Sequence, residues 1–249
     1  MTLGEFFREN PKVALAFSGG VDSAYLLYAA IEHGADVRAY YVKSAFQPRF
    51  ELEDARKLAA QLNADFAVLD ADVLNCPQIA ENPPDRCYHC KKLLFQKIAD
   101  RATKDGYATI LDGTNASDDA EDRPGMRAIR EMSVRSPLRE CGLTKEEIRR
   151  RSKEAGLFTW NKPAYACLAT RIPSGESITR EKLARTERAE DFLSSLGFAD
   201  FRVRSVQNAA KIQVPSAQLV RILEKREDIL RELKSYYASV TLDLEARDE

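Results

Sequence analysis

Residues 18–23 have the composition of a phosphate-binding turn. Their sequence, SGGVDS, follows the apolar run 12–17 and precedes residues 21–33, whose apolar positions recur at helical spacing. A turn between a buried strand and a helix directs backbone N–H groups, two hydroxyls and a helix N-terminus at one place, where an anion binds. Glycines let the main chain approach phosphate oxygens, and a carboxylate suits a bridging magnesium ion. The candidate phosphate and magnesium ligands are Ser18, Gly19, Gly20, Asp22 and Ser23.

The spacing of the glycines excludes two other nucleotide-binding loops. The turn lacks Gly-x-x-x-x-Gly-Lys, so it is not a Walker A loop, and it lacks the Gly-x-Gly-x-x-Gly fingerprint of dinucleotide-binding folds. A tight turn that uses Gly-Gly for backbone geometry alone is the alternative. The complete hexapeptide between a strand and a helix favours the phosphate site.

The chain has five cysteines, an odd number and too few for a disulfide scaffold, which favours thiol chemistry or metal binding. Cys87 and Cys90 lie where the loop 82–86 enters a helical pattern, and a helix N-terminus favours thiolates. Two unrelated helix cysteines are the alternative. His89 is disfavoured as a ligand beside both thiols, because neighbouring helix residues point about 100 degrees apart.

A further cysteine, Cys167, lies in the segment 162–176, a connection that contains two prolines and is apolar around the thiol. Cys76 and Cys141 match no motif and are interpreted as ordinary thiols. Trp160, the single tryptophan, has no assigned role.

Arg202 and Arg204 alternate with apolar residues in a strand-like segment. The period of two places both guanidinium groups on one face of the strand. Two parallel guanidinium forks suit a phosphate, and a solvated strand face is the alternative.

Length and charge limit the class of protein. The 249 residues are 44% hydrophobic and 31% charged, as in a globular protein, and the net charge is −1. This balance provides no general field for a polyanion, so nucleic acid is disfavoured as a partner. No apolar run is long enough for a membrane span and the start does not resemble a secretory signal, so we expect no membrane association and a cytoplasmic location.

Strand-like and helical segments alternate through the first half of the chain, which predicts an α/β fold with a parallel sheet. The strands are expected at residues 12–17, 37–42, 66–69 and 109–111, and the helices at 21–33, 51–62 and 87–104. Residues 112–123 are expected to form a loop at the carboxyl end of a strand, where ligands gather in such sheets.

The long connection 160–175 marks the predicted domain boundary. We expect a first domain over residues 1–165 and a smaller α+β domain over 166–249. A capping box, Thr144-x-x-Glu147, opens a basic helix before the boundary. Beyond it the patterns predict a helix over 179–196, a hairpin over 201–214, a helix over 216–237 and a strand over 240–244.

The turn SGGVDS resembles the pyrophosphate loop of the PP-loop ATP pyrophosphatases, which cleave ATP to AMP and pyrophosphate. The segment DGTNASD, residues 112–118, is also similar to this superfamily, and a generic polar loop is its alternative. The resemblance implies ATP and Mg²⁺ as cofactors and adds Gly113 and Asn115 to the nucleotide-binding residues. In these enzymes AMP activates a carboxyl or carbonyl oxygen, which a nitrogen or sulfur nucleophile then displaces.

Nearly the whole chain resembles the LarE-type ATP-dependent sulfur transferases, which sulfurate a pyridinium biscarboxylate mononucleotide on the route to a nickel-pincer cofactor. The resemblance rests on SGGVDS, RCYHC, DGTNASDDAEDRPG, VRSPL, ACLATRIPSG and FRVR, in that order. It implies that Arg202 and Arg204 bind the substrate phosphate and that Glu190 is an acidic active-site residue. The chain departs from the family at Ser205-Val206 and at residues 210–213, where Gln213 replaces an expected carboxylate.

The resemblance also implies how sulfur is supplied. Single-cysteine members give up the sulfur of the residue that matches Cys167, whereas three-cysteine members are thought to carry a [4Fe-4S] cluster. We therefore expect Cys87, Cys90 and Cys167 to be cluster ligands, with one iron left open for a hydrosulfide. Sulfide or another sulfur donor is then a partner. Homo-oligomers occur in the family.

The sequence keeps two other functions open. One is a cluster-dependent tRNA thiolase of the same superfamily, although such an enzyme needs a basic face or an added RNA-binding module. The other is an ATP-binding module without catalysis. The expected reaction is adenylation of a substrate carboxylate, with loss of pyrophosphate, followed by attack of sulfur near Cys167 to give a thiocarboxylate.

Overall fold

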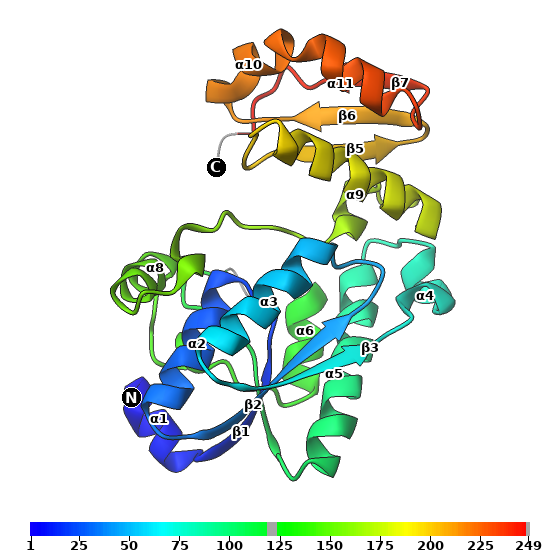
Figure 1. Ribbon diagram of the computed structural model, residues 1–249. Coiled ribbons are helices and arrows are strands. Elements are labelled where there is room, and N and C mark those ends of the chain that lie inside the picture. The colour runs from blue at the N-terminus through cyan, green and yellow to red at the C-terminus, as the bar shows by residue number, and fades with distance from the viewer. Residues whose placement is uncertain (119–123, 248–249) are drawn as a thin grey trace. The chain divides into compact units, whose positions relative to one another are not determined.

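The computed structural model describes residues 1–118 and 124–247, which form two compact units (Figure 1). The first unit contains Met1–Val73 and Asp85–Lys162, and the second contains Leu74–Pro84 and Pro163–Glu249. Residues 119–123 of the loop predicted at 112–123 lie outside the described residues, as do residues 248 and 249. Within the described ranges, no helix has the length and apolar character needed to cross a membrane.

A four-stranded parallel sheet with the order β3-β2-β1-β4 forms the centre of the first unit. Its strands are β1 (Lys12–Ala16), β2 (Asp36–Lys43), β3 (Asp65–Asp70) and β4 (Thr109–Leu111). Leu15 lies in register with Ala39 of β2 and Leu111 of β4, and all three side chains are fully buried. The α/β class and the parallel sheet predicted from the sequence are confirmed.

The strand order reverses at β1, because β2 pairs with one of its edges and β4 with the other. The segments that follow β1 and β4 therefore leave the sheet side by side. In open α/β sheets ligands bind at such a switch point, outside the carboxyl ends of the strands. The two polar segments predicted to bind nucleotide follow these two strands.

Helices flank this sheet and supply much of its core (Figure 1). They are α1 (Leu3–Glu9), α2 (Val21–Glu32), α3 (Arg49–Gln61), α5 (Arg86–Lys104), α6 (Pro124–Glu131), α7 (Pro137–Glu140) and α8 (Lys145–Glu154), with 3₁₀ turns η1 (Val73–Asn75) and η2 (Phe158–Asn161). Leu26 and Leu27 of α2 are fully buried, and the chain turns away after the helix at Gly34, whose φ is 73°.

The second unit has its own three-stranded sheet, of order β5-β6-β7, and its own core. Its strands are β5 (Arg202–Val206), β6 (Ala209–Gln213) and β7 (Ser239–Leu242), and its helices are α4 (Pro77–Ala80), α9 (Arg180–Ser195), α10 (Leu219–Glu224) and α11 (Arg226–Leu233), with 3₁₀ turns η3 (Leu168–Arg171) and η4 (Ser216–Gln218). Val203 and Ile212 face each other across the antiparallel β5–β6 pair and are buried with Leu193 of α9.

Two sequence-based expectations differ from the structure. The single helix predicted over residues 216–237 is wrong, because the chain leaves the helical conformation at Lys225, where ψ is 10°, between α10 and α11. Of the two hydrogen bonds of the capping box predicted at Thr144, only the one accepted by the Thr144 side chain is present. The Thr144 hydroxyl accepts a bond from the Glu147 N–H at 3.3 Å, while the Glu147 carboxylate pairs with Arg150 and Arg151.

The segment Leu74–Pro84 also differs from the predicted division, which placed it in the first domain. It joins the second unit through Asn82, a buried residue whose Nδ2 donates to the carbonyl oxygens of Ile172 at 3.2 Å and Pro173 at 2.7 Å. The Ile178 N–H donates to the Ala80 carbonyl at 2.7 Å. These long-range bonds carry no local sequence signal.

Replacing Gly113 by alanine tests the close approach of the loop after β4 to the start of α2. A Cβ at this position would lie 2.9 Å from the backbone nitrogen of Ser23, so we expect a loss of about 1–3 kcal/mol in the free energy of unfolding, measured by urea denaturation. Gly4→Ala is the control, because it places alanine in a helix against a movable His33 ring. A Gly113→Ala protein as stable as this control would contradict the contact.

Replacing Asn82 by alanine tests the attachment of Leu74–Pro84. One buried and one partly buried hydrogen bond are lost, and the Ile172 carbonyl stays buried without this donor, so we expect destabilisation by about 1–3 kcal/mol and faster amide exchange in this segment. The exposed Asn63 has a similar positive φ, 48° against 58°, so Asn63→Ala reports the backbone cost alone. Equal effects of the two substitutions would count against the proposed anchor.

Candidate active site

The turn between β1 and α2 is held by hydrogen bonds among its own residues. The hydroxyls of Ser18 and Ser23 lie 3.0 Å apart, the Ser23 hydroxyl donates to the Gly20 carbonyl at 3.2 Å, and the Gly20 N–H donates to the Ser18 hydroxyl at 3.3 Å. Gly19 has a φ of 73°, and a Cβ there would approach Ala55 at 3.1 Å. Glycine is therefore required by both the backbone conformation and the neighbouring helix.

The N-terminal amides of α2 are left without a side-chain cap. Gly20 is the N-cap residue and makes no side-chain capping bond, so no side chain of the cap neutralises the N-terminal amides. The location of Ser18, Gly19, Gly20 and Ser23 between strand and helix is the one predicted from the sequence. Their role as ligands of a nucleotide stays a prediction.

Asp22, in the first turn of α2, is the predicted magnesium ligand. Its Oδ2 accepts a bond from the Lys145 ammonium at 2.6 Å, and its Oδ1 accepts one from Asn115 Nδ2 at 3.4 Å. Burial raises the pKa of this carboxyl, while the bond from Lys145 opposes that increase. A single partly buried carboxylate beside a phosphate-binding turn fits Mg²⁺, which takes one or two carboxylates and completes its shell with phosphate oxygens and water.

The loop after β4 is fixed by a second set of bonds. Asp112 is buried and accepts bonds from the hydroxyls of Thr114 at 2.5 Å and Ser136 at 2.6 Å. Gly113 lies against the backbone of Ser23, and the Asn115 side chain reaches Asp22. The structure thus brings Gly113 and Asn115 to the turn 18–23 and the start of α2, beside the residues that the sequence predicts to bind nucleotide.

Lys145 is a residue of this site that sequence reasoning missed. It begins α8 after the Thr144 cap, and its backbone N–H donates to the Ser117 hydroxyl at 3.0 Å. A basic residue at a helix start gives no sign of a partner 123 positions away. The only feature that the sequence itself offers is the position of Lys145 directly after the Thr144 cap.

Cys87 and Cys90 lie three residues apart near the start of α5, so they share one side of the helix. Cys87 is exposed and Cys90 is partly buried, and Arg86 Nη2 lies 3.3 Å from the Cys87 sulfur. Two thiols on one side of a helix start, one of them exposed, fit cluster ligands. Cys167 belongs to the second unit, and no group of three or more metal-ligating side chains was found among residues 1–118 and 124–247. The three-cysteine set stays a prediction.

A cavity of about 400 Å³ in the second unit is lined by four arginines, Arg171, Arg202, Arg204 and Arg247. Burial, together with the positive charges of Arg171 and Arg247, lowers the pKa of Arg202 to about 10. The same causes lower the pKa of Arg204. Asp243 and Glu245 also line the cavity, but the arginines outnumber them, and this excess of positive charge favours an anion. Both predicted arginines line this one cavity. Sequence reasoning missed both other arginines: Arg171 lies within the quoted segment ACLATRIPSG but was assigned no role, and Arg247 lies near the C-terminus outside every motif.

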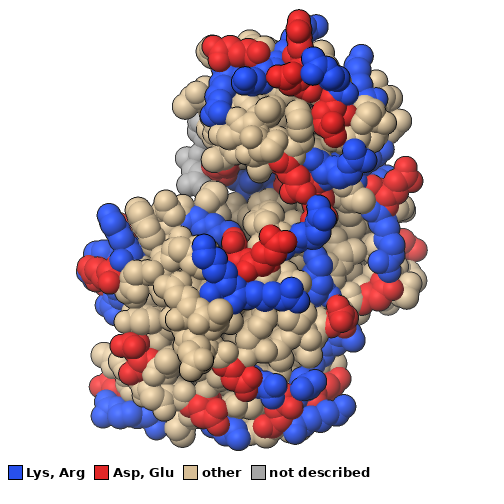
Figure 2. Space-filling model, in the orientation of Figure 1, with Lys and Arg blue, Asp and Glu red and all other residues tan. Residues whose placement is uncertain are grey.

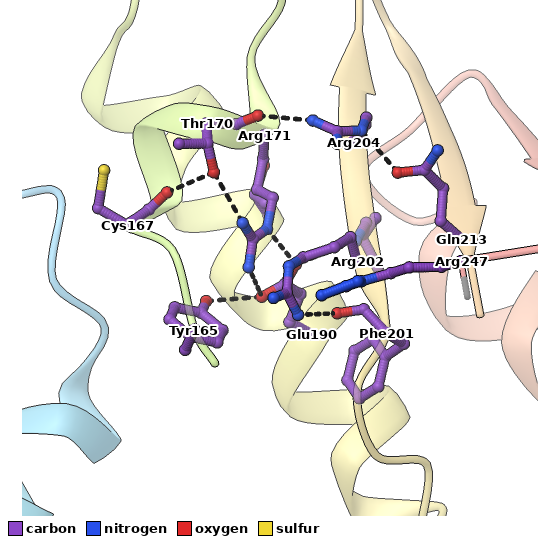
Figure 3. A network of polar contacts seen from close by, with 12 residues as sticks. Tyr165, Cys167, Thr170, Arg171, Glu190, Phe201, Arg202, Arg204, Gln213 and Arg247 are labelled. Atoms are coloured by element: carbon purple, nitrogen blue, oxygen red, sulfur yellow. Dashed lines mark hydrogen bonds and ion pairs between the residues drawn. The ribbon is translucent and has the colours of Figure 1, made fainter. Parts of the chain in front are cut away.

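The two predicted arginines are held in place by polar contacts (Figure 3). Arg202 Nη2 donates to the Ala164 carbonyl at 2.6 Å, and Arg204 Nη1 donates to the Thr170 carbonyl at 2.8 Å. Arg204 Nε also donates to Gln213 Oε1 at 2.6 Å. Position 213 thus lacks the expected carboxylate. The Gln213 amide instead lies between Arg204 and a carboxylate, because its Nε2 donates to Asp243 Oδ2 at 2.7 Å.

Glu190 occupies the centre of this network and is 6% exposed (Figure 3). Its Oε1 accepts bonds from Arg171 Nε at 2.7 Å and from the Val203 N–H at 3.0 Å, and its Oε2 accepts one from the Tyr165 hydroxyl at 2.6 Å. With both oxygens engaged, the carboxylate positions the arginine cavity. A direct catalytic role for Glu190 stays a prediction.

Cys167 is the residue before η3. Its carbonyl accepts bonds from the N–H and the hydroxyl of Thr170, at 3.0 and 2.8 Å, while its thiol lies at the edge of the network (Figure 3). Thr170 also contacts Arg171 and Arg204, so one 3₁₀ turn connects the predicted sulfur residue to the arginine cavity.

Comparisons with known proteins agree with this architecture. Residues 12–82 match the family described as Queuosine biosynthesis protein QueC. The chain is 37% identical to an uncharacterized protein of Synechocystis over 98% of its length and 92% of that protein. It is 25% identical to the tRNA-specific 2-thiouridylase MnmA of Thermotoga petrophila, over 61% of this chain and 54% of that protein.

A further relative covers both units. The chain is 35% identical to pyridinium-3,5-bisthiocarboxylic acid mononucleotide synthase of Lactiplantibacillus plantarum, over 98% of this chain and 89% of that protein. Identity at this level over nearly the full length of both proteins shows common membership of one family. The chain therefore belongs to the LarE-type sulfur transferases of the PP-loop superfamily.

Proposed function

We propose that this ATP-using sulfurtransferase adenylates a carboxylate of a pyridinium biscarboxylate mononucleotide and converts it to a thiocarboxylate, a step in nickel-pincer cofactor biosynthesis. The observation that carries the proposal is the phosphate-binding turn, whose uncapped helix start lies beside the carboxylate of Asp22 and the loop after β4. A second domain with an arginine-lined cavity supports a phosphorylated small-molecule substrate.

The first chemical step uses the residues of the first unit. An oxygen of the substrate carboxylate attacks the α-phosphorus of ATP, and the bond to the bridging oxygen of pyrophosphate breaks. The N-terminal amides of α2 and the hydroxyls of Ser18 and Ser23 are placed to neutralise charge on the leaving group. A magnesium ion held by Asp22 would supply further charge neutralisation there.

Substrate recognition uses the arginine cavity of the second unit. Arg202 and Arg204 are rigidly held, so they bind a phosphate with little loss of side-chain entropy. Glu190 neutralises Arg171 and fixes β5 through the Val203 N–H, which keeps the two strand arginines on one face. We assign Glu190 to positioning in this reaction.

The second chemical step transfers sulfur. A sulfur nucleophile attacks the acyl carbon of the mixed anhydride, the bond from that carbon to the AMP oxygen breaks, and AMP leaves with the oxygen. Dividing the reaction in two avoids expelling hydroxide from a carboxylate. We propose Cys87, Cys90 and Cys167 as the residues that hold a [4Fe-4S] cluster, which supplies an iron able to carry hydrosulfide taken from sulfide or another donor.

Charge argues against tRNA as the substrate. Basic and acidic side chains are interspersed on the face of the molecule seen in Figure 2, and the net charge of the chain is −1. A protein that binds tRNA gathers positive charge on one face to contact phosphates. The likeness to the 2-thiouridylase is therefore attributed to shared ATP chemistry.

The reaction itself is the first test. With ATP, Mg²⁺, sulfide and the biscarboxylate mononucleotide, we expect one AMP and one pyrophosphate per thiocarboxylate, with sulfur replacing oxygen in the product mass. Arg204→Ala should raise the KM for the mononucleotide about 10- to 100-fold, because a charge-assisted bond to phosphate is lost. The matched control is Arg188→Ala, a surface residue paired with Glu232. A rate of pyrophosphate release that is the same with and without the mononucleotide would refute the proposal.

The cysteine assignment is tested by spectroscopy on protein purified without oxygen. We expect iron, acid-labile sulfide and a visible absorption band in the wild type, and loss of all three in Cys87→Ala, Cys90→Ala and Cys167→Ala. Cys76→Ala and Cys141→Ala should keep the colour. An active protein without iron, in which Cys167 becomes dehydroalanine after turnover, would show that this cysteine is itself the sulfur source.

A further inference from the structure

One ion pair lies inside the proposed nucleotide site and has no place in the reaction described so far. Lys145 Nζ is 2.6 Å from Asp22 Oδ2, and the two side chains are 33% and 23% exposed. The pair connects the start of α8 to the start of α2. It occupies one oxygen of the carboxylate that is proposed to bind magnesium.

The two demands on Asp22 conflict. The Lys145 ammonium lies where a divalent cation bound to Oδ2 would lie, and the two positive charges repel each other. The other oxygen already accepts a bond from Asn115 at 3.4 Å. The ammonium and a metal ion therefore compete for Asp22, and the metal binds more favourably once Lys145 leaves its present position.

The surroundings of Lys145 allow its side chain to move while its backbone stays in place. The Lys145 N–H is bound to the Ser117 hydroxyl at 3.0 Å, the Ala116 N–H to the Leu143 carbonyl at 2.8 Å, and the Thr144 hydroxyl to the Glu147 N–H at 3.3 Å. These bonds fix the start of α8 against the loop after β4. The flexible four-carbon side chain, with three donors on its ammonium, can exchange partners around this fixed point.

We propose that Lys145 occupies the cation position at Asp22 while nucleotide is absent, and moves to an oxygen of the β- or γ-phosphate when Mg²⁺-ATP binds. The inference rests on the proposed use of ATP. The exchange leaves no charge unpaired, because Mg²⁺ replaces the ammonium at Asp22 and the ammonium gains a phosphate. Lys145 is then a ligand of the pyrophosphate portion of ATP.

A static salt bridge that only attaches α8 to α2 predicts different behaviour. Removing such a bridge would weaken the site for every ligand, because its elements would be less well held. Removing a cation that competes for Asp22 has opposite effects on two ligands. The bare metal should bind better, and the metal-bound polyphosphate should bind worse.

The test compares wild type with Lys145→Met and Lys145→Gln, using Lys153→Met as the control. Lys153 lies on the same helix, exposed and over the Trp160 ring, so this control removes one positive charge from α8 outside the site. Mn²⁺ binding to nucleotide-free protein is measured by electron paramagnetic resonance. Binding of Mg²⁺-ATP, Mg²⁺-pyrophosphate and AMP is measured by titration calorimetry, and circular dichroism shows which variants are folded.

We expect Lys145→Met to bind Mn²⁺ about 10-fold more tightly than wild type, and Mg²⁺-ATP and Mg²⁺-pyrophosphate about 10- to 100-fold more weakly. AMP binding should change less than about 3-fold. Lys145→Gln should show the same changes in affinity as Lys145→Met. It serves as the test variant if Lys145→Met does not fold.

Unchanged or weaker Mn²⁺ binding in the folded variants would overturn the exchange, as would equal losses for AMP and ATP. Either result would identify a static bridge while leaving the proposed function intact. A wild type that binds no Mg²⁺-ATP would overturn the proposed function and this inference together.

Discussion

The pairing of β4 with β1 decides where the first unit can bind a ligand. Because β2 and β3 extend the sheet from the other edge of β1, the chain reverses direction across the sheet at this one pair. The turn after β1 and the loop after β4 are therefore neighbours although they are about ninety residues apart. Gly113 against Ser23, and Asn115 against Asp22, are direct consequences of that topology.

In the second unit a buried carboxylate performs the corresponding organising role. Glu190 would be costly to bury alone, and the guanidinium of Arg171, the Val203 N–H and the Tyr165 hydroxyl together compensate that cost. The same three contacts join α9 to β5, to η3 through Arg171 and to the segment before η3 through Tyr165. The positive cavity beside them depends on this arrangement, because Arg202 projects from the strand that Glu190 anchors.

Residues that act locally could be predicted from the sequence, and residues that act through distant contacts could not. The turn 18–23 and the alternation of Arg202 with Arg204 are readable because strand and helix periodicity determine their geometry. Glu190 was placed near the site by resemblance, but its buried contacts give no pattern in a helix. Lys145 and the segment Leu74–Pro84 were missed because their partners lie roughly ninety or more positions away in the chain.

The path of the chain between the two units affects how the protein is made. It passes from one unit to the other three times, after Val73, Pro84 and Lys162, so Leu74–Pro84 leaves the ribosome long before the rest of its unit. The two hydrogen bonds from Asn82 can form only after Ile172 and Pro173 have been synthesised. Helix α5, which carries Cys87 and Cys90, begins directly after the segment Leu74–Pro84. The chain just before the thiol pair therefore reaches its final contacts only after residues 172 and 173 have been made.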